Sequence, residues 1–553
     1  MTGAPGPPLA QIRESAQALL AQGKVEETWE FFLAALDAVL GKNRELELLV
    51  LKLRRERIGR HTERLDARQI ALLFDTLLAQ GGLPEPIDPE AEAREDAALD
   101  REIAEAEQAA TGPSRGRRKT RKAEPGWRTT GVEHQVHVIE VPAEGQTCPT
   151  CQHPMGCIGV DVTRRLTYVP GHFVEEEAHR QKWACGRCKD AVVTAPAPPQ
   201  VLPRCAADAS LLAHVVVSKF ADHTPLHRLH RIYARSGADI PVSTLADWVA
   251  GVGALVEPLV ERVAARVREA YVVRTDATGL KVLDPRSPDH IEMGSIWAYI
   301  GDDRDVLFRY TPTGEGATGP WTFLAGRTGY VQADAATVFD RLFTGQAARA
   351  VEVGCLAHAR RKLVALEDMD CRVAYPLKLI ARVYRVEHLA DARGLTPDDR
   401  VALRRQRAAP VLERLHRWCG LTRAQEPPST DLAKAAGYFV NHWTALSRFL
   451  EDGRLDPDNN LCESQLRDIA LGRRNYLFCG SHDAARRAAA LYSLMRTCAQ
   501  SGVPPLPYLT DVLAQLPTAR TPSELDALLP HRWSPPASTP VTPAPSTEQA
   551  ITH

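Results

Sequence analysis

Residues 459–480 read NNLCESQLRDIALGRRNYLFCG and carry one glutamate, Glu463, inside a strongly basic segment. The segment is predicted to form a helix that begins near this glutamate. Two asparagines and three arginines surround it: Asn459, Asn460, Arg467, Arg473 and Arg474. A lone carboxylate among cations can supply the negative charge that a divalent cation requires, whereas the simpler alternative is a capped helix with an ordinary salt-bridged face.

The bulk composition is that of a soluble protein with room for several domains. Of the 553 residues, 44% are hydrophobic and 25% are charged, which is ordinary for globular chains. No run of about 18 apolar residues occurs, and the first residues lack a basic region followed by an apolar one. We therefore expect neither a membrane span nor a signal peptide, and a cytoplasmic location. The formal net charge of -1 excludes a global nucleic-acid footprint, so contacts with a polyanion must come from local basic clusters.

Residues 1–84 are predicted to form a helical N-terminal module. Leucine, alanine, glutamate and arginine dominate residues 10–80, and four apolar residues lie near coiled-coil spacing: Val39, Leu46, Val50 and Leu53. The polar Asn43 falls at a core position of that pattern. A dimeric coiled coil and an intramolecular helical hairpin both fit these residues.

Two segments are predicted to lie outside the folded domains. Residues 85–128 are first acidic, in PEAEAREDAALDREIAEAEQ, and then basic, in SRGRRKTRK, so we interpret them as a solvated, charged linker. The basic run is either a charged spacer or a contact for phosphates. Residues 534–553 are rich in proline, serine and threonine and are predicted to be a disordered tail.

Residues 129–200 carry the strongest local motif, two C-x-x-C pairs formed by Cys148, Cys151, Cys185 and Cys188. Four thiolates close a tetrahedral zinc site without an open position, so we predict a structural Zn²⁺ that stabilises a small β-rich module. The alternative is unliganded or redox-active cysteines. His153 and Cys157 are close enough in sequence to replace one of the four ligands.

Residues 201–268 contain a pattern typical of a helix-turn-helix. One helix precedes a turn around Gly237, and a second is predicted to begin at Ser243, whose hydroxyl can cap it. The second helix, with Ser243 and Thr244, would enter a DNA major groove, and phosphates would be contacted from the first helix by Arg228, Arg231 and Arg235. A helix pair packed inside the protein gives the same pattern. Three histidines at helical spacing are interpreted as exposed or hydrogen-bonded: His223, His227 and His230.

Short β-rich runs follow at 271–284, 294–302, 305–311, 329–334 and 350–358, and then a long helical stretch over about 357–449. Asp276 and Asp334 each end an apolar run, where desolvation favours partnering the carboxylate with a cation. If their strands are adjacent, these two and Glu463 could hold two Mg²⁺ ions that act on a phosphodiester. Strand-end turn residues are the alternative. Four rival carboxylates are expected in solvated loops or turns: Asp284, Asp302, Asp303 and Asp305.

At these residues the chain resembles DDE transposases of the insertion-sequence-66 family. The matching stretches run from about residue 49 to residue 533 and include LVLKLRRERIGRHTERLD, the two C-x-x-C pairs, STLADWV, RTDATGLKVLDP, GCLAHARRKL, DNNLCESQLRDIALGRRNYLFCGS and LLPHRW. The order of NN, Glu, Arg, GRRN, LF and YLTDVL after residue 458 is the most specific of them. The sequence departs from the family pattern in DAATVFD after Asp334 and in Ser464, where the family commonly has arginine.

The resemblance implies a multidomain α+β protein. Its ribonuclease-H-like α/β catalytic core would span 269–500, with an all-helical insertion at about 365–450 and a C-terminal helical element at 501–533. It also implies a catalytic triad, Asp276, Asp334 and Glu463, which holds Mg²⁺ (or Mn²⁺). The basic HARRKL motif would add three DNA-binding residues, His358, Arg360 and Arg361. Asn459, Asn460 and the arginines after Glu463 would position the DNA backbone.

The function implied by the resemblance is that of a transposase. It would bind terminal inverted repeats of double-stranded DNA, cleave a strand and transfer the transposon 3′-OH into target DNA. At least a homodimer on DNA is expected, with accessory proteins of the same element as further partners and a nucleoid-associated, cytoplasmic location. The alternatives are a transposase-derived DNA-binding protein without activity, and a nuclease or resolvase on the same core.

Overall fold

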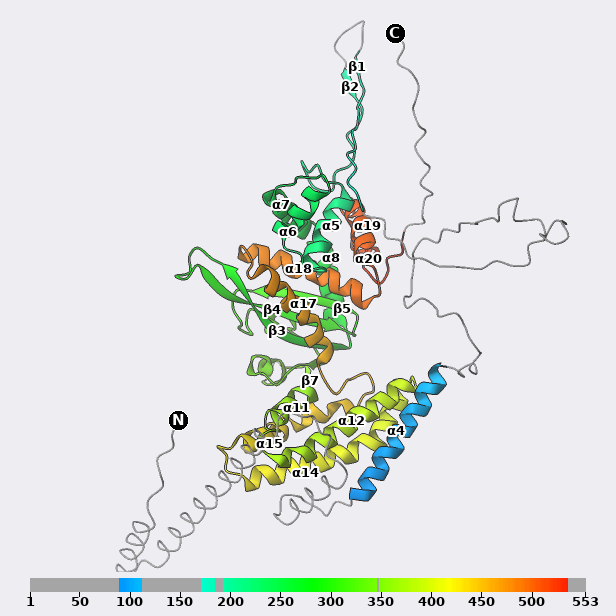
Figure 1. The fold of residues 1–553 in the computed structure, drawn as a ribbon, viewed down its shortest axis with the longest axis vertical. Helices are drawn as coiled ribbons and strands as arrows, with labels where there is room; N and C mark the ends of the chain where they lie inside the picture. Colours follow the sequence, from blue (N-terminus) through cyan, green and yellow to red (C-terminus); the bar gives the residue numbers. More distant parts are fainter. Residues whose placement is uncertain (1–88, 112–170, 185–191, 346–347, 536–553) are drawn as a thin grey trace, which may run out of the picture.

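A computed structural model of the chain describes residues 89–111, 171–184, 192–345 and 348–535. The predicted N-terminal module, the four cysteines of the predicted zinc site, the basic run SRGRRKTRK and residues 536–553 of the predicted tail lie outside these residues. The described part is a mixed α/β protein in which a central sheet lies between two groups of helices (Figure 1).

Five strands form a mixed sheet in the order β5-β4-β3-β6-β7. The first three in sequence are antiparallel neighbours, while β6 runs parallel to β3 and β7 parallel to β6. Each strand overlaps a run predicted as β-rich: β3 (Val272–Leu283), β4 (Ile291–Gly301), β5 (Asp305–Thr311), β6 (Tyr330–Gln332) and β7 (Val351–Val353). The apolar runs form strands because their side chains are buried on the sheet, as in the fully buried Val273 and Val331.

Three helices pack on the sheet and share its core: α8 (Glu257–Glu269), α17 (Asn460–Tyr476) and α18 (His482–Gln500). Helix α18 lies along the outer strand β5 and satisfies its backbone. Thr497 Oγ1 accepts a 3.1 Å hydrogen bond from the N–H of Val306, and Ser493 Oγ accepts one of 2.8 Å from that of Phe308. An edge strand otherwise exposes such groups, so these two hydroxyls close this edge of the sheet.

Helices before and after the core pack together at one end of the molecule (Figure 1). They are α5 (Ala209–Phe220), α6 (Leu226–Arg235), α7 (Val242–Leu255), α19 (Pro505–Gln515) and α20 (Pro522–Ala527). Arg262 of α8 holds α20 through a bidentate ion pair with Asp526, at 2.6 and 2.9 Å. The C-terminal helices are thereby fixed onto the helix that precedes the sheet.

The predicted helix, turn and helix over 224–253 are present as α6 and α7. Gly237 has a positive φ of 91° in the turn between them. Helix α7 begins at Val242 after Pro241, with no side-chain cap, so the predicted capping by Ser243 is wrong. Proline at the cap already supplies the fixed φ, and Ser243 lies within the helix. Helix α6 buries Leu229 and Tyr233 and exposes Arg228, Arg231 and Arg235.

A helical unit with its own core interrupts the chain between β7 and α17. Its helices are α11 (Leu356–Val364), α12 (Ala374–Ala392), α13 (Pro397–Leu403), α14 (Ala409–Gln425), α15 (Asp431–Asn441) and α16 (Trp443–Ser447). The buried Arg404 holds the end of the unit against α12, because it binds Glu387 through two nitrogens and donates to the carbonyls of Phe449 and Leu455. The sequence prediction of a long helical stretch here is confirmed.

The acidic segment that we expected in a solvated linker instead forms helix α4 (Pro89–Thr111), which packs along α12 (Figure 1). Leu99 and Ile103 are buried against the helical unit. Arg382 of α12 pairs with Glu92 at 2.9 Å and with Asp96 at 2.7 Å. The expectation failed because partner cations on another helix neutralise the acidic residues, and composition alone does not reveal such partners.

Shorter elements complete the described chain. Two antiparallel strands, β1 (Lys182–Ala184) and β2 (Val192–Thr194), lie in the predicted zinc module. The single-turn helices are α9 (Pro320–Phe323), α10 (Asp340–Phe343), η2 (Thr337–Phe339), η3 (Cys371–Val373) and η5 (Arg448–Leu450). A π-helical turn, η4, spans Arg404–Ala408. Among the described helices none alone has both the length and the apolar composition of a membrane span, although α7 and α8 together, bent by 46°, reach that composition.

Candidate active site

Three carboxylates from distant parts of the chain line one cavity of about 380 Å³. Asp276 lies on β3, Asp334 follows β6, and Glu463 lies in the first turn of α17. The parallel pairing of β3 with β6 brings the two aspartates together, as the sequence predicted for adjacent strands. The cavity is also lined by Ala277, Thr278, Cys355, His358, Arg361, Asn459, Leu466, Arg467 and Ala470.

Asp276 differs from expectation in one respect, because it lies inside β3 and not at its end. The strand continues to Leu283 through an antiparallel hairpin with β4, in which Asp276 is opposite Ala298. Its carboxylate accepts a 2.7 Å hydrogen bond from the backbone N–H of Ala277. Pairing with β4 extends β3 beyond Asp276.

The electrostatics of the cavity oppose three free carboxylates. Burial, followed by the charges of Asp334 and Glu463, raises the pKa of Asp276 to about 6. Burial also raises the pKa of Asp334, against the opposing effect of His358. Carboxylates gathered in a partly desolvated site are stabilised by a cation, and Mg²⁺ and Mn²⁺ prefer oxygen ligands. The donor set therefore fits a divalent metal.

Basic side chains on α11 and α17 face the same cavity. Arg361 Nη2 donates a hydrogen bond to Glu463 Oε1, and Arg467 is one helical turn beyond the glutamate. Burial lowers the pKa of His358, which is offset in part by the charge of Asp334. Arg360 is exposed and does not line the cavity. The cavity thus combines acidic ligands with cations that could neutralise a phosphate.

The asparagines and the two remaining arginines of the opening stretch have different surroundings. Asn459 is buried, and its Nδ2 donates a 3.0 Å hydrogen bond to the carbonyl of Thr275 on β3. This contact anchors α17 to β3, whereas we expected Asn459 to hold DNA backbone. Asn460 is exposed and bonded to Asp458. Arg473 donates to the carbonyl of Gly279, and Arg474 is exposed further along α17.

Sequence reasoning missed Arg274, a buried arginine two residues before Asp276. Its guanidinium binds Asp303 at 2.7 Å, Gln332 at 2.5 Å and Asp456 at 2.5 Å, and it donates to the carbonyl of Asp458 at 3.0 Å. The network joins β3, β6 and the segment that leads into α17, which are the elements that carry the three carboxylates. A charged residue inside the run YVVRTD was the available signal.

Cys355 was also missed. Its thiol accepts hydrogen bonds from the backbone N–H groups of His358, at 3.4 Å, and Asn459, at 3.3 Å. Burial raises the pKa of this thiol to about 11, so it stays protonated at neutral pH. It therefore joins the starts of α11 and α17 beside the cavity as a neutral group.

The rival carboxylates are not all solvated. Asp302 and Asp303 lie at positive φ in the turn between β4 and β5, as expected of turn residues. Asp284 and Asp305 are buried, which corrects our expectation. Asp305 pairs with Arg266 at 3.0 Å, and Asp284 with Arg286 at 2.9 Å. Each is neutralised by an arginine that the local sequence did not identify as its partner.

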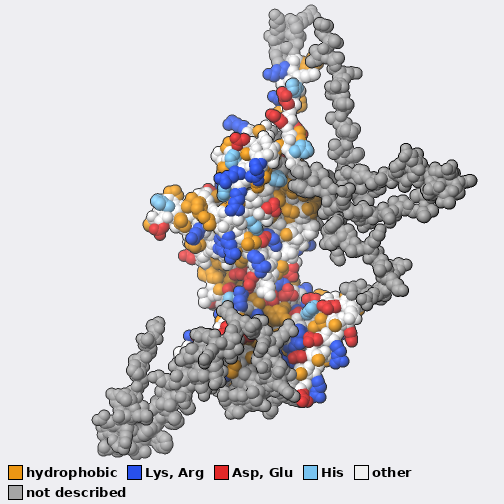
Figure 2. Space-filling view, viewed as in Figure 1, with side chains coloured by type: hydrophobic (Ala, Val, Ile, Leu, Met, Phe, Trp, Pro, Cys, Tyr) orange, Lys and Arg blue, Asp and Glu red, His pale blue; other side chains and the backbone are white. Residues whose placement is uncertain are grey.

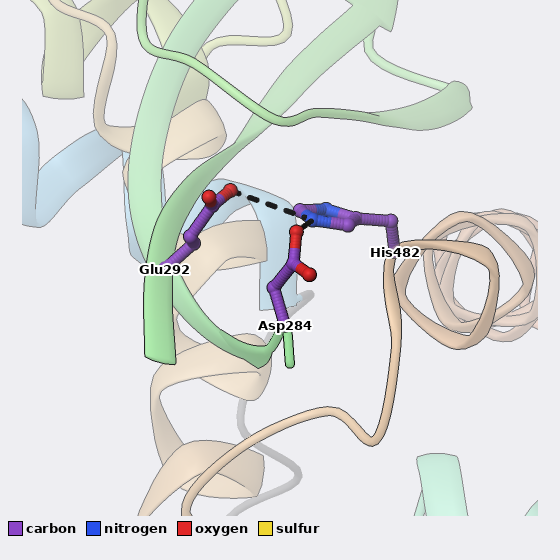
Figure 3. Close-up of side chains that lie close together, drawn as sticks. All are labelled: Asp284, Glu292 and His482. Atoms are coloured by element: carbon purple, nitrogen blue, oxygen red, sulfur yellow. Dashed lines mark hydrogen bonds and ion pairs between the residues drawn. The ribbon is translucent and has the colours of Figure 1, made fainter. Parts of the chain in front are cut away.

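Asp284 also belongs to a second acidic cluster, shown in Figure 3. His482 Nε2 lies 3.2 Å from a carboxylate oxygen of Asp284 and 3.5 Å from one of Glu292. Such a group could hold a cation, but both oxygens of Asp284 already bind Arg286. The hydrogen bonds from Arg286 hold the pKa of Asp284 well below its usual range. We interpret the cluster as a structural contact that holds α18 to the β3–β4 hairpin.

The predicted helix-turn-helix arginines lie apart from the cavity. On the face drawn in Figure 2, Lys and Arg side chains gather over α6 and over α17. His230 Nδ1 lies 2.9 Å from the carbonyl of Ile240, so this histidine is hydrogen-bonded, as expected. His227 is exposed. His223 has a positive φ of 54°, and its Nδ1 is buried without a partner among the described residues.

Comparison with known families matches most of the chain. The model of the "Transposase IS66 family" matches residues 204–487, and that of the "IS66 C-terminal element" matches residues 493–531. The "zinc-finger binding domain of transposase IS66" matches residues 146–189, a range that holds all four cysteines of the two C-x-x-C pairs. The first match includes the three carboxylates and the helical unit.

Three proteins of Sinorhizobium fredii (strain NBRC 101917 / NGR234) are similar over long ranges. "Uncharacterized protein y4hP" is 32% identical over 514 residues, which cover 88% of each chain. "Uncharacterized protein y4jD" is 31% identical over 71% of this chain and 80% of its own length. "Uncharacterized protein y4qI" is 32% identical over 72% and 75%. Their printed names state no activity.

Proposed function

Because the chain belongs to the IS66 family of transposases, we propose that it cleaves DNA strands at transposon ends and joins them to target DNA. The observation that supports this most directly is the meeting of Asp276, Asp334 and Glu463 in one cavity with Arg361 and Arg467. The sheet order and the parallel pairing of β6 and β7 favour a ribonuclease-H-like core for the same region.

In this proposal the three carboxylates hold divalent cations, Mg²⁺ or Mn²⁺. Bound there, the cations would polarise the scissile phosphate and activate the attacking oxygen. The chain's own residues bind and orient the DNA. Arg467 and Arg361 neutralise phosphate oxygens, for which Arg361 would give up its contact with Glu463.

The buried arginine network has a positioning role. Arg274 contacts Gln332, two residues before Asp334, and the segment 456–458 that precedes α17. It therefore fixes the spacing of the carboxylates without contacting the DNA. A site whose ligands come from three elements requires such support to keep its geometry.

Recognition of the transposon ends is proposed for the N-terminal half. The zinc-finger domain would hold its Zn²⁺ through Cys148, Cys151, Cys185 and Cys188, and α7 would enter the major groove while the exposed arginines of α6 contact phosphates. Ser243 and Thr244 lie on the first turn of α7, where base contacts occur in such units. Synapsis of two ends requires at least a dimer on DNA.

The test is an in vitro assay of the full chain on labelled DNA that carries the element's own ends, in Mg²⁺ or in EDTA. We expect nicking and joining in Mg²⁺ alone, and their loss in Glu463→Gln and Asp276→Ala. Arg393→Ala, at an exposed arginine that follows α12 and does not line the cavity, is the control and should retain cleavage. Strand transfer that persists in Asp276→Ala would overturn the assignment. Cleavage without joining would identify a nuclease or resolvase instead, and metal-independent binding without cleavage would indicate an inactive DNA-binding protein.

A further inference from the structure

The residue after α17 adopts a conformation that few non-glycine residues adopt. Leu477 has φ 62° and ψ -46°. The N–H of Phe478 donates a 2.7 Å hydrogen bond to the carbonyl of Tyr476, which closes a three-residue γ-turn around it. This form of the γ-turn is rare and strained for a side chain with a Cβ. Glycine would adopt it freely, yet the sequence has leucine here.

The surrounding contacts hold this turn in place. Cys479 follows it and pairs with β3, where its N–H donates to Lys281 at 2.9 Å and its carbonyl accepts from Leu283 at 2.9 Å. On the other side, the hydroxyl of Tyr476 is bonded to that of Tyr492 in α18. The backbone of the turn is thus anchored at both ends.

Two residues of the turn, Leu477 and Phe478, have apolar side chains that are exposed to solvent. Leu477 is 64% exposed and Phe478 is 41% exposed. Exposed apolar area gives no folding stability, and the backbone at Leu477 carries a conformational cost. Strain and exposure at one site are typical of a contact made with a ligand, because neither is explained by the packing of the free protein.

The turn ends a ridge that starts at the candidate active site. From Glu463, the exposed face of α17 presents Arg467, Leu471, Arg474 and then the turn, at helical spacing. No carboxylate among the described residues forms an ion pair with Arg467 or Arg474. Cations that alternate with apolar groups complement a nucleic acid, whose phosphates take the arginines and whose base faces take the apolar groups.

We propose that Leu477 and Phe478 form an apolar wedge that unstacks a base pair of the bound DNA. The inference rests on the proposed function and adds a contact site to it. Glu463 and Leu477 are separated by about 21 Å along the helix, at about 1.5 Å per residue. With the DNA axis along α17, as the line of arginines on that helix suggests, and at about 3.4 Å per base pair, the wedge acts about six base pairs from the phosphate at the carboxylates. Apolar side chains inserted between base steps unstack and kink DNA in this way.

The test uses the full chain and duplexes cut from the ends of the element, each with 2-aminopurine at a single position. Binding is followed by fluorescence in Ca²⁺ in place of Mg²⁺, and unstacking makes the probe brighter. We expect a maximum about six base pairs from the cleavage position. Leu477→Gly combined with Phe478→Ala should abolish it and weaken binding on the order of tenfold. Leu421→Ala, at a comparably exposed leucine of α14, is the matched control and should change neither.

Further variants separate the wedge from its neighbours. Arg474→Ala should weaken binding and reduce its salt dependence but leave the position of the fluorescence maximum unchanged. Leu477→Gly alone should not lower the unfolding temperature, because glycine accepts the positive φ. A fall in that temperature would assign Leu477 to stability and overturn the proposal.

Other outcomes would also overturn the wedge. These are wild-type fluorescence in the double variant, or a double variant that loses only self-association, which would make the turn a protein interface. Cleavage in Mg²⁺ without any fluorescence maximum would reject the wedge and keep the transposase. A maximum in a wild-type chain that never cleaves would reject the proposed catalysis and keep the wedge.

Discussion

Arg274 donates a 2.5 Å hydrogen bond to Asp456, although 182 positions of sequence separate the two residues. The bond connects β3, which carries Asp276, to the segment that leads into the helix of Glu463. The arginine is 1% exposed, so the pair is partly shielded from solvent. The relative position of two carboxylates of the candidate site therefore depends on one buried guanidinium.

Replacement of Arg274 should damage both the fold and the site. Arg274→Met leaves the buried Gln332 without its donor and the half-exposed Asp456 without its cation, at a cost of about 1–3 kcal/mol. We expect this loss in urea unfolding, together with weaker Mg²⁺ binding. Arg486→Met is the control, because that arginine is 55% exposed and its partner Asp483 is 70% exposed, so its loss should cost little. Stability equal to the wild type in Arg274→Met would show that the network is dispensable.

Asp276→Asn should stabilise the metal-free protein. The pKa of about 6 shows that burial and two neighbouring carboxylates oppose the charge of Asp276. Removal of that charge should raise the free energy of unfolding in EDTA by about 1 kcal/mol at pH 7.5, where the carboxyl is ionised. Millimolar Mg²⁺ should raise the unfolding temperature of the wild type more than that of the variant.

The matched control for this experiment is Asp284→Asn. That carboxylate is paired with Arg286 and His482, so its replacement should destabilise the protein in either buffer. A rise in the free energy of unfolding for Asp276→Asn, together with a fall for Asp284→Asn, would support electrostatic repulsion at Asp276. Destabilisation by Asp276→Asn in EDTA would contradict it.

Helix α4 should detach in acid. Burial alone would raise the pKa of Asp96, but Arg382, Arg385 and Lys378 hold it below the ordinary value of 3.8. The pKa of Glu92 is lowered on balance by Arg382, Lys378 and Arg414. Because both folded pKa values lie below the unfolded ones, the stability that they add is present above about pH 4 and is lost as the pH falls through the folded values.

Hydrogen exchange over residues 89–111 measures this effect. We expect protection that is constant from pH 7 to about pH 5 and is lost below about pH 4, after correction for the intrinsic exchange rate. The double variant Glu92→Gln, Asp96→Asn should show weak protection at every pH. Constant protection of the wild type down to pH 3 would mean that Leu99 and Ile103 hold the helix without the ion pairs.

The two hydroxyls on β5 should contribute measurably to stability. Ser493→Ala and Thr497→Val each leave a buried backbone N–H of β5 without an acceptor, at a cost of about 1–2 kcal/mol. Thermal unfolding of the single variants and the double variant gives the two contributions. Thr510→Val, at a half-buried threonine whose hydroxyl bonds only within α19, should be nearly neutral. Wild-type stability in the double variant would show that solvent reaches this strand.

The strands and the helix that carries Glu463 could be predicted from sequence because their signals are local. Apolar runs such as those around Val273 and Val331 are buried whatever their partners, and the acidic residues within or after them were found for the same reason. The pairing of β3 with β6 then brought Asp276 and Asp334 together. These features depend on short segments and their periodicity.

Several of the failures concern partners distant in sequence. Helix α4 has the composition of a solvated linker and is helical because it meets the arginines of α12. Asp305 is buried because Arg266 pairs with it, and the bond from Asn459 to the carbonyl of Thr275 was not foreseen. One sequence does not show which residues meet across the fold, so the role of each polar side chain followed from the tertiary structure.

The closed edge of β5 has a consequence for assembly. Because Ser493 and Thr497 occupy the outward backbone groups of Val306 and Phe308, a second chain cannot extend the sheet by adding a strand there. If copies pair on DNA, as the proposed function requires, any contact that they make at this edge would use side chains and not a shared sheet. A contact of that kind can form and dissociate without unfolding the strand.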